Sequence, residues 1–182
     1  QDGHVRAASR FTELCEAKRF ISLHFSGGTT EILLYDNGKL TIIGGTKDIS
    51  FGQLLDRIGT KLGLDFPCGE ELDTLAYRYL TKNVKAKILV FPKIKTNSGY
   101  INLSGIESAV FRFIDGKTLE TDEKNQLILG IFSSISTAIL DMLDEVYKKY
   151  AINDFLFAGG VSSSKTLRKM LDEAGVKHNF VF

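Results

Sequence analysis

Residues 20–43 read FISLHFSGGTTEILLYDNGKLTII and contain three short strand-like runs separated by two tight turns. The runs cover 20–25, 31–35 and 40–43, and each contains the β-branched or aromatic residues that suit a pleated sheet. The second turn, Asp-Asn-Gly at 36–38, favours a hairpin because Asn and Gly tolerate positive φ. We therefore predict an antiparallel three-stranded meander.

After the meander, the spacing of apolar residues changes from a strand period to a helical period. The further predicted elements are helices over 4–18, 49–62, 70–80, 105–114, 121–149 and 162–174, and strands over 88–91, 155–158 and 176–182. This order fits a mixed sheet with helices on its faces. It is also the order of one lobe of the actin/sugar-kinase/chaperone superfamily, so we predict an α/β, RNase H-like lobe of that type.

The composition is that of an ordinary globular protein and excludes several classes. The chain has 182 residues, of which 43% are hydrophobic and 25% charged, and its net charge of +1 creates no global basic field. Two cysteines, Cys15 and Cys68, cannot form a disulfide framework, so we expect a reducing, cytoplasmic location. No uninterrupted apolar run reaches the ~18 residues that span a bilayer, so we expect no membrane partner.

The first candidate site is the turn Ser26-Gly27-Gly28-Thr29-Thr30. Two glycines let the backbone pass close to a ligand and point amides into a concavity, and the flanking hydroxyls can donate to phosphate oxygens. The alternative is a plain hairpin turn, which is common. The hydroxyls on both sides favour the phosphate interpretation, because a plain turn does not need them.

Two further candidates lie downstream. Gly159-Gly160 follows the apolar run 155–158 and leads into a helix, where an anionic group could approach the helix N-terminus. In the alternative interpretation these glycines only form a tight turn, and Ser162 or Ser163 caps the helix. Asp56, on the helix after the meander, could accept hydrogen bonds from ribose hydroxyls, although a lone helical Asp is more often a solvated charge.

Several segments together, in order and spacing, resemble the tRNA threonylcarbamoyltransferase (TsaD) family, formerly called O-sialoglycoprotein endopeptidases. The segments that carry the resemblance are 26–30, Asp56 through Leu62-Gly63-Leu64-Asp65-Phe66-Pro67-Cys68-Gly69, Leu103-Ser104-Gly105-Ile106, Ala158-Gly159-Gly160-Val161-Ser162 and Thr166-Leu167-Arg168. The resemblance covers nearly the whole chain. It implies a nucleotide-binding domain of a metal-dependent transferase that carries a threonylcarbamoyl group to a tRNA adenosine.

The resemblance also implies which residues bind ATP or an adenylate. Phosphate contacts are implied at Ser26, Gly27, Gly28 and Thr29, ribose contact at Asp56, and further nucleotide contacts at Gly69, Gly160 and Ser164. The family's iron or zinc site uses two histidines and an aspartate, of which only His4 is matched, because the other two positions fall outside residues 1–182. We therefore expect the metal only in a full-length parent, and residues 1–182 to be one lobe of a two-lobe protein with a helical insertion at about 64–115.

Four replacements distinguish this chain from the family pattern. Thr29 stands in place of a histidine, Gln53 of a glutamate, Cys68 of a glycine and Ser164 of an asparagine. They indicate a diverged paralogue, and one alternative is a non-catalytic protein that dimerises with a homologous lobe or a catalytic paralogue. A metallopeptidase is the weaker alternative, because the chain contains no H-E-x-x-H motif.

Overall fold

The computed structural model describes Leu14 and residues 17–82, 86–174 and 178–182. The elements in chain order are β1 (Arg19–Phe25), β2 (Thr30–Asp36), β3 (Lys39–Thr46), α2 (Phe51–Lys61), α3 (Gly69–Lys82), β4 (Thr96–Asn97), β5 (Tyr100–Ile101), α4 (Ser104–Ile114), α5 (Thr121–Tyr150), β6 (Asp154–Ala158), the 3-10 helix η2 (Gly160–Ser163), α6 (Lys165–Glu173) and β7 (Asn179–Val181). The helix predicted over 4–18 lies mostly outside the described residues.

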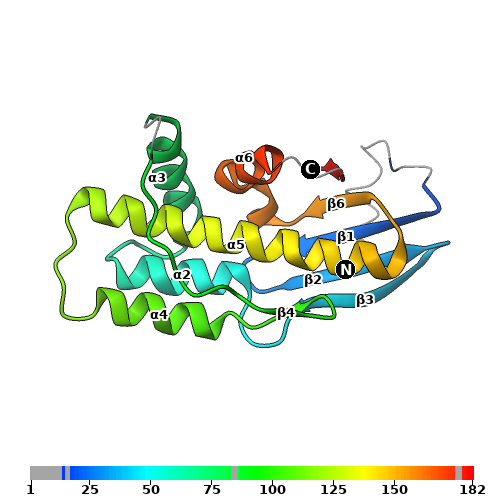
Figure 1. Ribbon diagram of the computed structural model, residues 1–182, viewed down its shortest axis with the longest axis horizontal. Helices are drawn as coiled ribbons and strands as arrows, with labels where there is room; N and C mark the ends of the chain where they lie inside the picture. The colour runs from blue at the N-terminus through cyan, green and yellow to red at the C-terminus, as the bar shows by residue number, and fades with distance from the viewer. Residues whose placement is uncertain (1–13, 15–16, 83–85, 175–177) are drawn as a thin grey trace.

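The strands form one mixed sheet in the order β4-β5-β3-β2-β1-β6-β7 (Figure 1). The predicted meander is confirmed, since β1 pairs antiparallel with β2 and β2 antiparallel with β3. β1 is also parallel to β6, which in turn is parallel to β7. Parallel pairing requires crossover connections, and α5 and α6 supply them. The fold class predicted from the element order is therefore confirmed.

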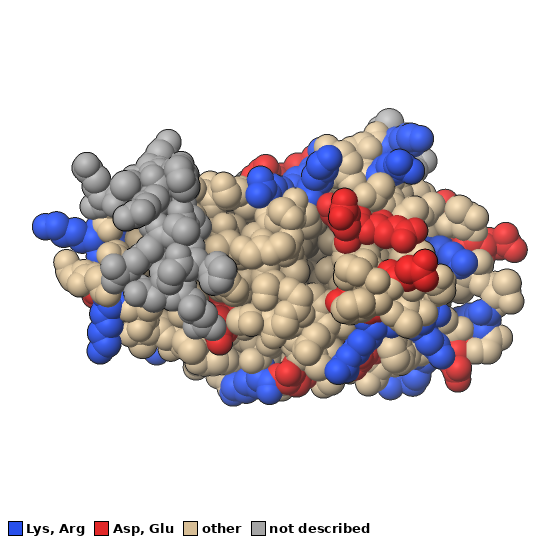
Figure 2. Space-filling view, turned by 180° about the vertical axis from the view of Figure 1, so that it is seen from behind, with Lys and Arg blue, Asp and Glu red and all other residues tan. Residues whose placement is uncertain are grey.

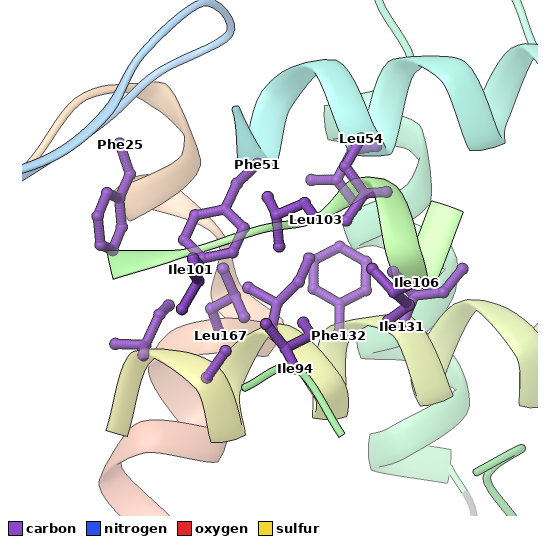
Figure 3. Close-up of a cluster of buried hydrophobic side chains, with 14 of the residues drawn as sticks. Phe25, Phe51, Leu54, Ile94, Ile101, Leu103, Ile106, Ile131, Phe132 and Leu167 are labelled. Atoms are coloured by element: carbon purple, nitrogen blue, oxygen red, sulfur yellow. The ribbon is translucent and has the colours of Figure 1, made fainter. Parts of the chain in front are cut away.

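The main core lies between one face of the sheet and the helices that cover it. Figure 3 shows Phe51 and Leu54 of α2 pointing toward Phe132 and Ile131 of α5. Phe25 of β1 joins this core, and its ring meets Phe51 edge-on at a centroid distance of 5.2 Å. Such aromatic pairs add to the stabilisation from buried area. This packing fixes the start of α2 against the end of β1, where the first glycine turn lies.

Three predictions about local structure are wrong. No strand forms over 88–91; this segment is an extended strap across α5, where the amide of Leu89 donates to the carbonyl of Gln126 at 3.1 Å. The helix predicted over 162–174 is divided into η2 and α6, because the side chain of Ser164 caps α6 by accepting a hydrogen bond from the amide of Leu167. The β4–β5 hairpin is missing from the predicted elements.

The longest helix, α5, is a core element. Among the described helices it alone is long and apolar enough to cross a membrane by length and composition, but 67% of its most apolar window is buried inside the domain. Figure 1 shows it running along the sheet beside α2 and α6. Figure 2 shows basic and acidic side chains interspersed over the rear face, in agreement with the small net charge.

Candidate functional site

The two diglycine turns lie side by side because they follow neighbouring parallel strands. β1 and β6 pair in register up to His24 and Ala158, so both strands end at the same edge of the sheet. Gly159 continues this contact: a Cβ atom there would lie 2.4 Å from the carbonyl oxygen of Phe25, and its φ is 93°. Only glycine fits such a position without strain. The carboxyl ends of adjacent strands are where open α/β sheets place ligands.

A cavity of about 800 Å³ opens at this edge, between the glycine turns and the helices α2, α3 and α6. Its lining residues are Gly27, Gly52, Leu55, Asp56, Pro67, Gly69, Glu70, Asp73, Thr74, Tyr77, Arg78, Phe132, Gly160, Val161, Ser163, Ser164 and Lys165. The volume is in the range of small-molecule sites, and the lining combines apolar side chains with a few polar groups, as such sites do.

The first turn is a tight hairpin with its glycine amides exposed. The amide of Ser26 donates to the carbonyl of Thr29 at 2.8 Å, and the amide of Thr29 donates to the Ser26 hydroxyl at 3.0 Å. Neither Gly27 nor Gly28 donates its amide to another described residue, and no atom lies within 4 Å of where their Cβ atoms would be. Exposed successive amides are the groups that bind anions.

The start of α2 holds this turn in place. The Ser50 hydroxyl donates to the carbonyl of Gly27 at 2.6 Å, and the amide of Phe51 donates to the Thr30 hydroxyl at 2.9 Å. Gly52 lets the helix approach this closely, because a Cβ atom there would lie 2.3 Å from the Cα of Gly27. The turn is therefore packed on α2 on one side and open to the cavity on the other.

Asp56 reaches the cavity from the next turn of α2. One carboxylate oxygen, Oδ1, accepts the amide of Cys68 at 2.8 Å and so fixes the segment that leads into α3. No described residue donates to the other oxygen, Oδ2. The side chain thus has both a structural bond and an acceptor left for a ligand. Gly69, the first residue of α3, lies beside it in the cavity wall.

A carboxylate of α3 occupies the N-terminus of α6. Asp73 accepts the hydroxyl of Ser164 at 2.6 Å, the amide of Lys165 at 2.9 Å and the amide of Thr166 at 3.0 Å. These are the first amides of α6, where a helix binds anions. The first amides of α6 are therefore occupied by the protein's own carboxylate, and binding of an anionic group at the preceding turn, 159–160, stays a prediction.

Asp73 joins two walls of the cavity, and no local pattern of residues marks it as part of a site. Tyr77 and Arg78 from α3 and Lys165 from α6 also line the cavity and were not predicted. In the part of the chain that the structure describes, neither Arg78 nor Lys165 has an ion-pair partner. The spacing of apolar residues in α3 indicates which residues face the core, but not which helix lies opposite the polar ones. The sequence alone therefore could not place Tyr77, Arg78 and Lys165 around one cavity.

The structure brings some predicted site residues together and separates others. Gly27, Asp56, Gly69, Gly160 and Ser164 line the one cavity. Ser26, Gly28 and Thr29 belong to the same turn but do not line it. Whether any of these residues binds a nucleotide stays a prediction.

The predicted metal ligand His4 lies outside the described residues. Across residues 17–82, 86–174 and 178–182, no group of three His, Cys, Asp or Glu side chains is arranged to hold a metal ion. The described residues therefore include none of the ligands of the metal site that the resemblance implies.

Comparisons with protein families and curated sequences point to one family. Residues 2–182 match the family model described as TsaD, tRNA N6-adenosine threonylcarbamoyltransferase. A protein of that name from Rippkaea orientalis is 31% identical over 98% of this chain and 53% of its own length. Another, from Streptococcus mutans, is 32% identical over 94% of this chain and 50% of its own length. The chain thus spans about half the length of these curated relatives.

Solved structures share the fold at low sequence identity. Full-length HypF in its phosphate- and nucleotide-bound form matches 99% of this chain and 39% of its own length, with a TM-score of 0.72 and 14% identity. The activator of 2-hydroxyisocaproyl-CoA dehydratase from Clostridium difficile, with bound ADPNP, matches 98% of this chain and 57% of its own length, with a TM-score of 0.60 and 15% identity. At such identities the likeness supports the fold alone.

Proposed function

Because this chain belongs to the TsaD family, we propose that its cavity binds the adenylate part of ATP or of a threonylcarbamoyl-adenylate. One observation carries the proposal: Gly27 of the first turn, Gly160 of the second turn and Asp56 line a single cavity of about 800 Å³. These three features are far apart in the sequence. Their convergence at the carboxyl ends of parallel strands suits a nucleotide site.

Each residue has a role that its hydrogen bonds leave available. The amide of Gly27, which lines the cavity, has no described partner and would bind the phosphate. Oδ2 of Asp56 would accept a ribose hydroxyl, since Oδ1 is already bonded to Cys68. Gly160 carries no side chain and leaves open space for a flat base. Two proteins of the same fold, HypF in its nucleotide-bound form and the dehydratase activator with bound ADPNP, add support for a nucleotide as the ligand.

For the whole protein we propose threonylcarbamoyl transfer to a tRNA adenosine in the cytoplasm. In that reaction the acceptor amine forms a bond to the carbamoyl carbon, the bond from that carbon to the phosphate oxygen breaks, and AMP leaves. Nucleoside analysis of tRNA from cells that lack the full gene tests this role. A level of the modified adenosine equal to that of the parent strain would contradict it.

A non-catalytic, dimerising paralogue is the second candidate, motivated by the four replacements in the family pattern. Two of the four residues that replace the family pattern have structural roles here. Gln53 accepts the amide of Ser50 at 3.0 Å in the capping box of α2, and Cys68 is fully buried behind Asp56. Size-exclusion chromatography with candidate homologous lobes would show a nucleotide-bound dimer if this candidate is correct, together with unchanged tRNA modification in the deletion strain.

The test of nucleotide binding is calorimetry with AMP on the wild-type chain and on Asp56→Asn. Asparagine keeps the oxygen that accepts the Cys68 amide but replaces the second acceptor by a donor. A hydrogen bond to a charged group contributes ~1.5–3 kcal/mol, so we expect AMP binding to weaken at least about ten-fold. The matched control is Asp65→Asn, a neighbouring exposed carboxylate that does not line the cavity.

The nucleotide itself provides a second control. The wild-type chain should prefer AMP over its 2′-deoxy form, and Asp56→Asn should lose that preference, because the bond in question is to a ribose hydroxyl. We expect weak affinity overall, since the superfamily places its ligand between two lobes. Equal affinity of Asp56→Asn and the wild type for AMP would contradict the site, and tight binding of ATP would contradict the need for a second lobe.

A further inference from the structure

The strap at 88–91 is held against α5 along one of its two edges. The amide of Leu89 donates to the carbonyl of Gln126 at 3.1 Å. A Cβ atom on Gly130 of α5 would lie 2.1 Å from the carbonyl oxygen of Leu89, so only a glycine there lets the strap come this close. Both backbone polar groups of Leu89 therefore face α5, which the chain between α3 and β4 crosses in Figure 1.

The other edge of the strap is open. In an extended segment the N–H and C=O groups of successive residues point to opposite sides. Since those of Leu89 face α5, those of Ile88 and Val90 face away from it, and neither of these two residues shares a hydrogen bond with another described residue. Their side chains are 42% and 87% exposed. The outer edge thus has the unpaired backbone groups and the apolar β-branched side chains on which another strand can pair.

The packing around the strap fixes this edge in place. The ring of Phe91 meets that of Phe113 in α4 edge-on at a centroid distance of 6.5 Å. Just after the strap, Nζ of Lys93 pairs with a carboxylate oxygen of Asp141 in α5 at 2.8 Å. Leu89 and Phe91 are half-buried against the main core. Because the edge is ordered before a partner arrives, little conformational entropy is left to lose on pairing.

We propose that the strap pairs with the strap of a second copy of this chain, antiparallel and about a two-fold axis at Leu89. In this register Ile88 of each copy lies opposite Val90 of the other, so the two exposed apolar side chains cover each other twice. Both pairs are of the hydrogen-bonded kind, which adds four backbone bonds between the copies. A patch that is its own complement is what a two-fold dimer requires.

The charges near the strap also favour a second copy as the partner. In the proposed register Lys87 falls opposite Phe91 of the other copy, so no like charges face each other. Lys93 is already paired with Asp141. The net charge of +1 gives little repulsion between two copies. The paired segments are short compared with a standard interface, so we expect a weak dimer, with a Kd on the order of 100 µM.

The first test is analytical ultracentrifugation of the chain over a range of concentrations. Val90→Pro removes one outward amide from each copy, and Val90→Lys puts a charge on the edge, so each should raise the Kd of the dimer at least about five-fold. The matched control is Ile42→Lys, because Ile42 is another exposed apolar residue, 50% exposed, but lies on β3; its Kd should equal that of the wild type. Urea unfolding of each variant checks that the fold is intact.

Cysteine variants test the register. The Cα atoms of a hydrogen-bonded antiparallel pair lie about 5.5 Å apart, within the range of a disulfide, whereas residues two positions out of register lie about 9 Å apart, beyond it. In a Cys15→Ser background, an equimolar mixture of Ile88→Cys and Val90→Cys should therefore oxidise to a covalent dimer at least about five-fold faster than either variant alone. The remaining native thiol, Cys68, is fully buried and should not react.

Three results would overturn the inference. They are a wild-type chain that stays monomeric up to about 1 mM, a dimer that Val90→Pro and Val90→Lys leave as strong as before, and a cysteine mixture that oxidises no faster than its components. The inference does not rest on nucleotide binding, because no residue of the strap lines the cavity. AMP should bind Val90→Lys as it binds the wild type, so the dimer and the nucleotide site can fail separately.

Discussion

Replacing Gly52 by alanine tests whether the contact between α2 and the first glycine turn positions the site. The added Cβ would lie 2.3 Å from the Cα of Gly27, about 1.1 Å short of the 3.4 Å at which ordinary contact begins, and 2.7 Å from the carbonyl oxygens of both Ser26 and Gly27. All three atoms belong to the backbone, so no side chain can rotate away. The turn and the helix must separate by about an ångström, a shift large enough to break the 2.6 Å bond from Ser50 to Gly27.

We expect Gly52→Ala to cost about 1–3 kcal/mol of unfolding free energy, the usual range for an overpacked position. In a domain of this size that corresponds to a fall in Tm of very roughly 2–12 °C. AMP binding should weaken about ten-fold or more, because the amides of the turn move away from the ligand. Urea unfolding followed by fluorescence or circular dichroism gives the first quantity, and calorimetry the second.

The matched control is Gly105→Ala, since Gly52 and Gly105 are each the second residue of a helix. No atom lies within 4 Å of a Cβ placed on Gly105, so alanine there should be neutral or should stabilise by up to about 1 kcal/mol through its higher helix propensity. Equal stability and equal AMP affinity of Gly52→Ala and Gly105→Ala would refute the idea that the approach of α2 determines the position of the turn.

The remaining predictions concern three carboxylates that accept hydrogen bonds from backbone amides. Burial raises the pKa of Asp48, but hydrogen bonds from the amides at the start of α4 lower it more, so the pKa is lowered overall. The stabilisation that the Asp48 carboxylate contributes should therefore be full above about pH 4 and be lost as the pH falls further. In Asp48→Asn, the free energy of unfolding in urea should fall less steeply between about pH 4 and lower pH than in the wild type. Asp73→Ala should cost about 1–3 kcal/mol, because the α6 amides and one hydroxyl lose their acceptor, and amide hydrogen exchange should speed up at the start of α6 but not in β1. Glu145 accepts the amide of Gly99 at 2.7 Å and the hydroxyl of Thr96 at 2.6 Å, so Glu145→Gln should speed amide exchange in the β4–β5 hairpin. AMP affinity should be unchanged, since Glu145 does not line the cavity.

The part of the fold that follows from local sequence was predictable. The Asn-Gly pair at 37–38 has both φ values positive, as the predicted hairpin requires, and the strands on either side pair as expected. The place of the two diglycine turns could also be inferred, because each follows an apolar strand and such strands end together in a mixed sheet. These features depend on the backbone conformation of a few consecutive residues.

Features that depend on distant partners were not predictable. Residues 88–91 are apolar and look like a strand, but the strap they form has no strand beside it and instead bonds to α5. Asp73 and Ser164 meet across 91 residues of sequence, and nothing in the local pattern of either helix indicates the other. Their contact exists because α3 and α6 both pack against α5 and against each other.

The hydrogen bonds of Asp56 and Ser164 determine which donors and acceptors these two side chains have left for a ligand. A serine hydroxyl has one donor and two lone pairs. The donor of Ser164 goes to Asp73 and one lone pair accepts the amide of Leu167, so the side chain can only accept from a ligand. An asparagine, which the family resemblance places there, would have two donors. In the proposed site Ser164 therefore has no donor to offer to a base, whereas Asp56 keeps an oxygen that could accept a ribose hydroxyl. If the cavity binds a nucleotide as proposed, we therefore expect weaker discrimination between bases than between ribose and deoxyribose.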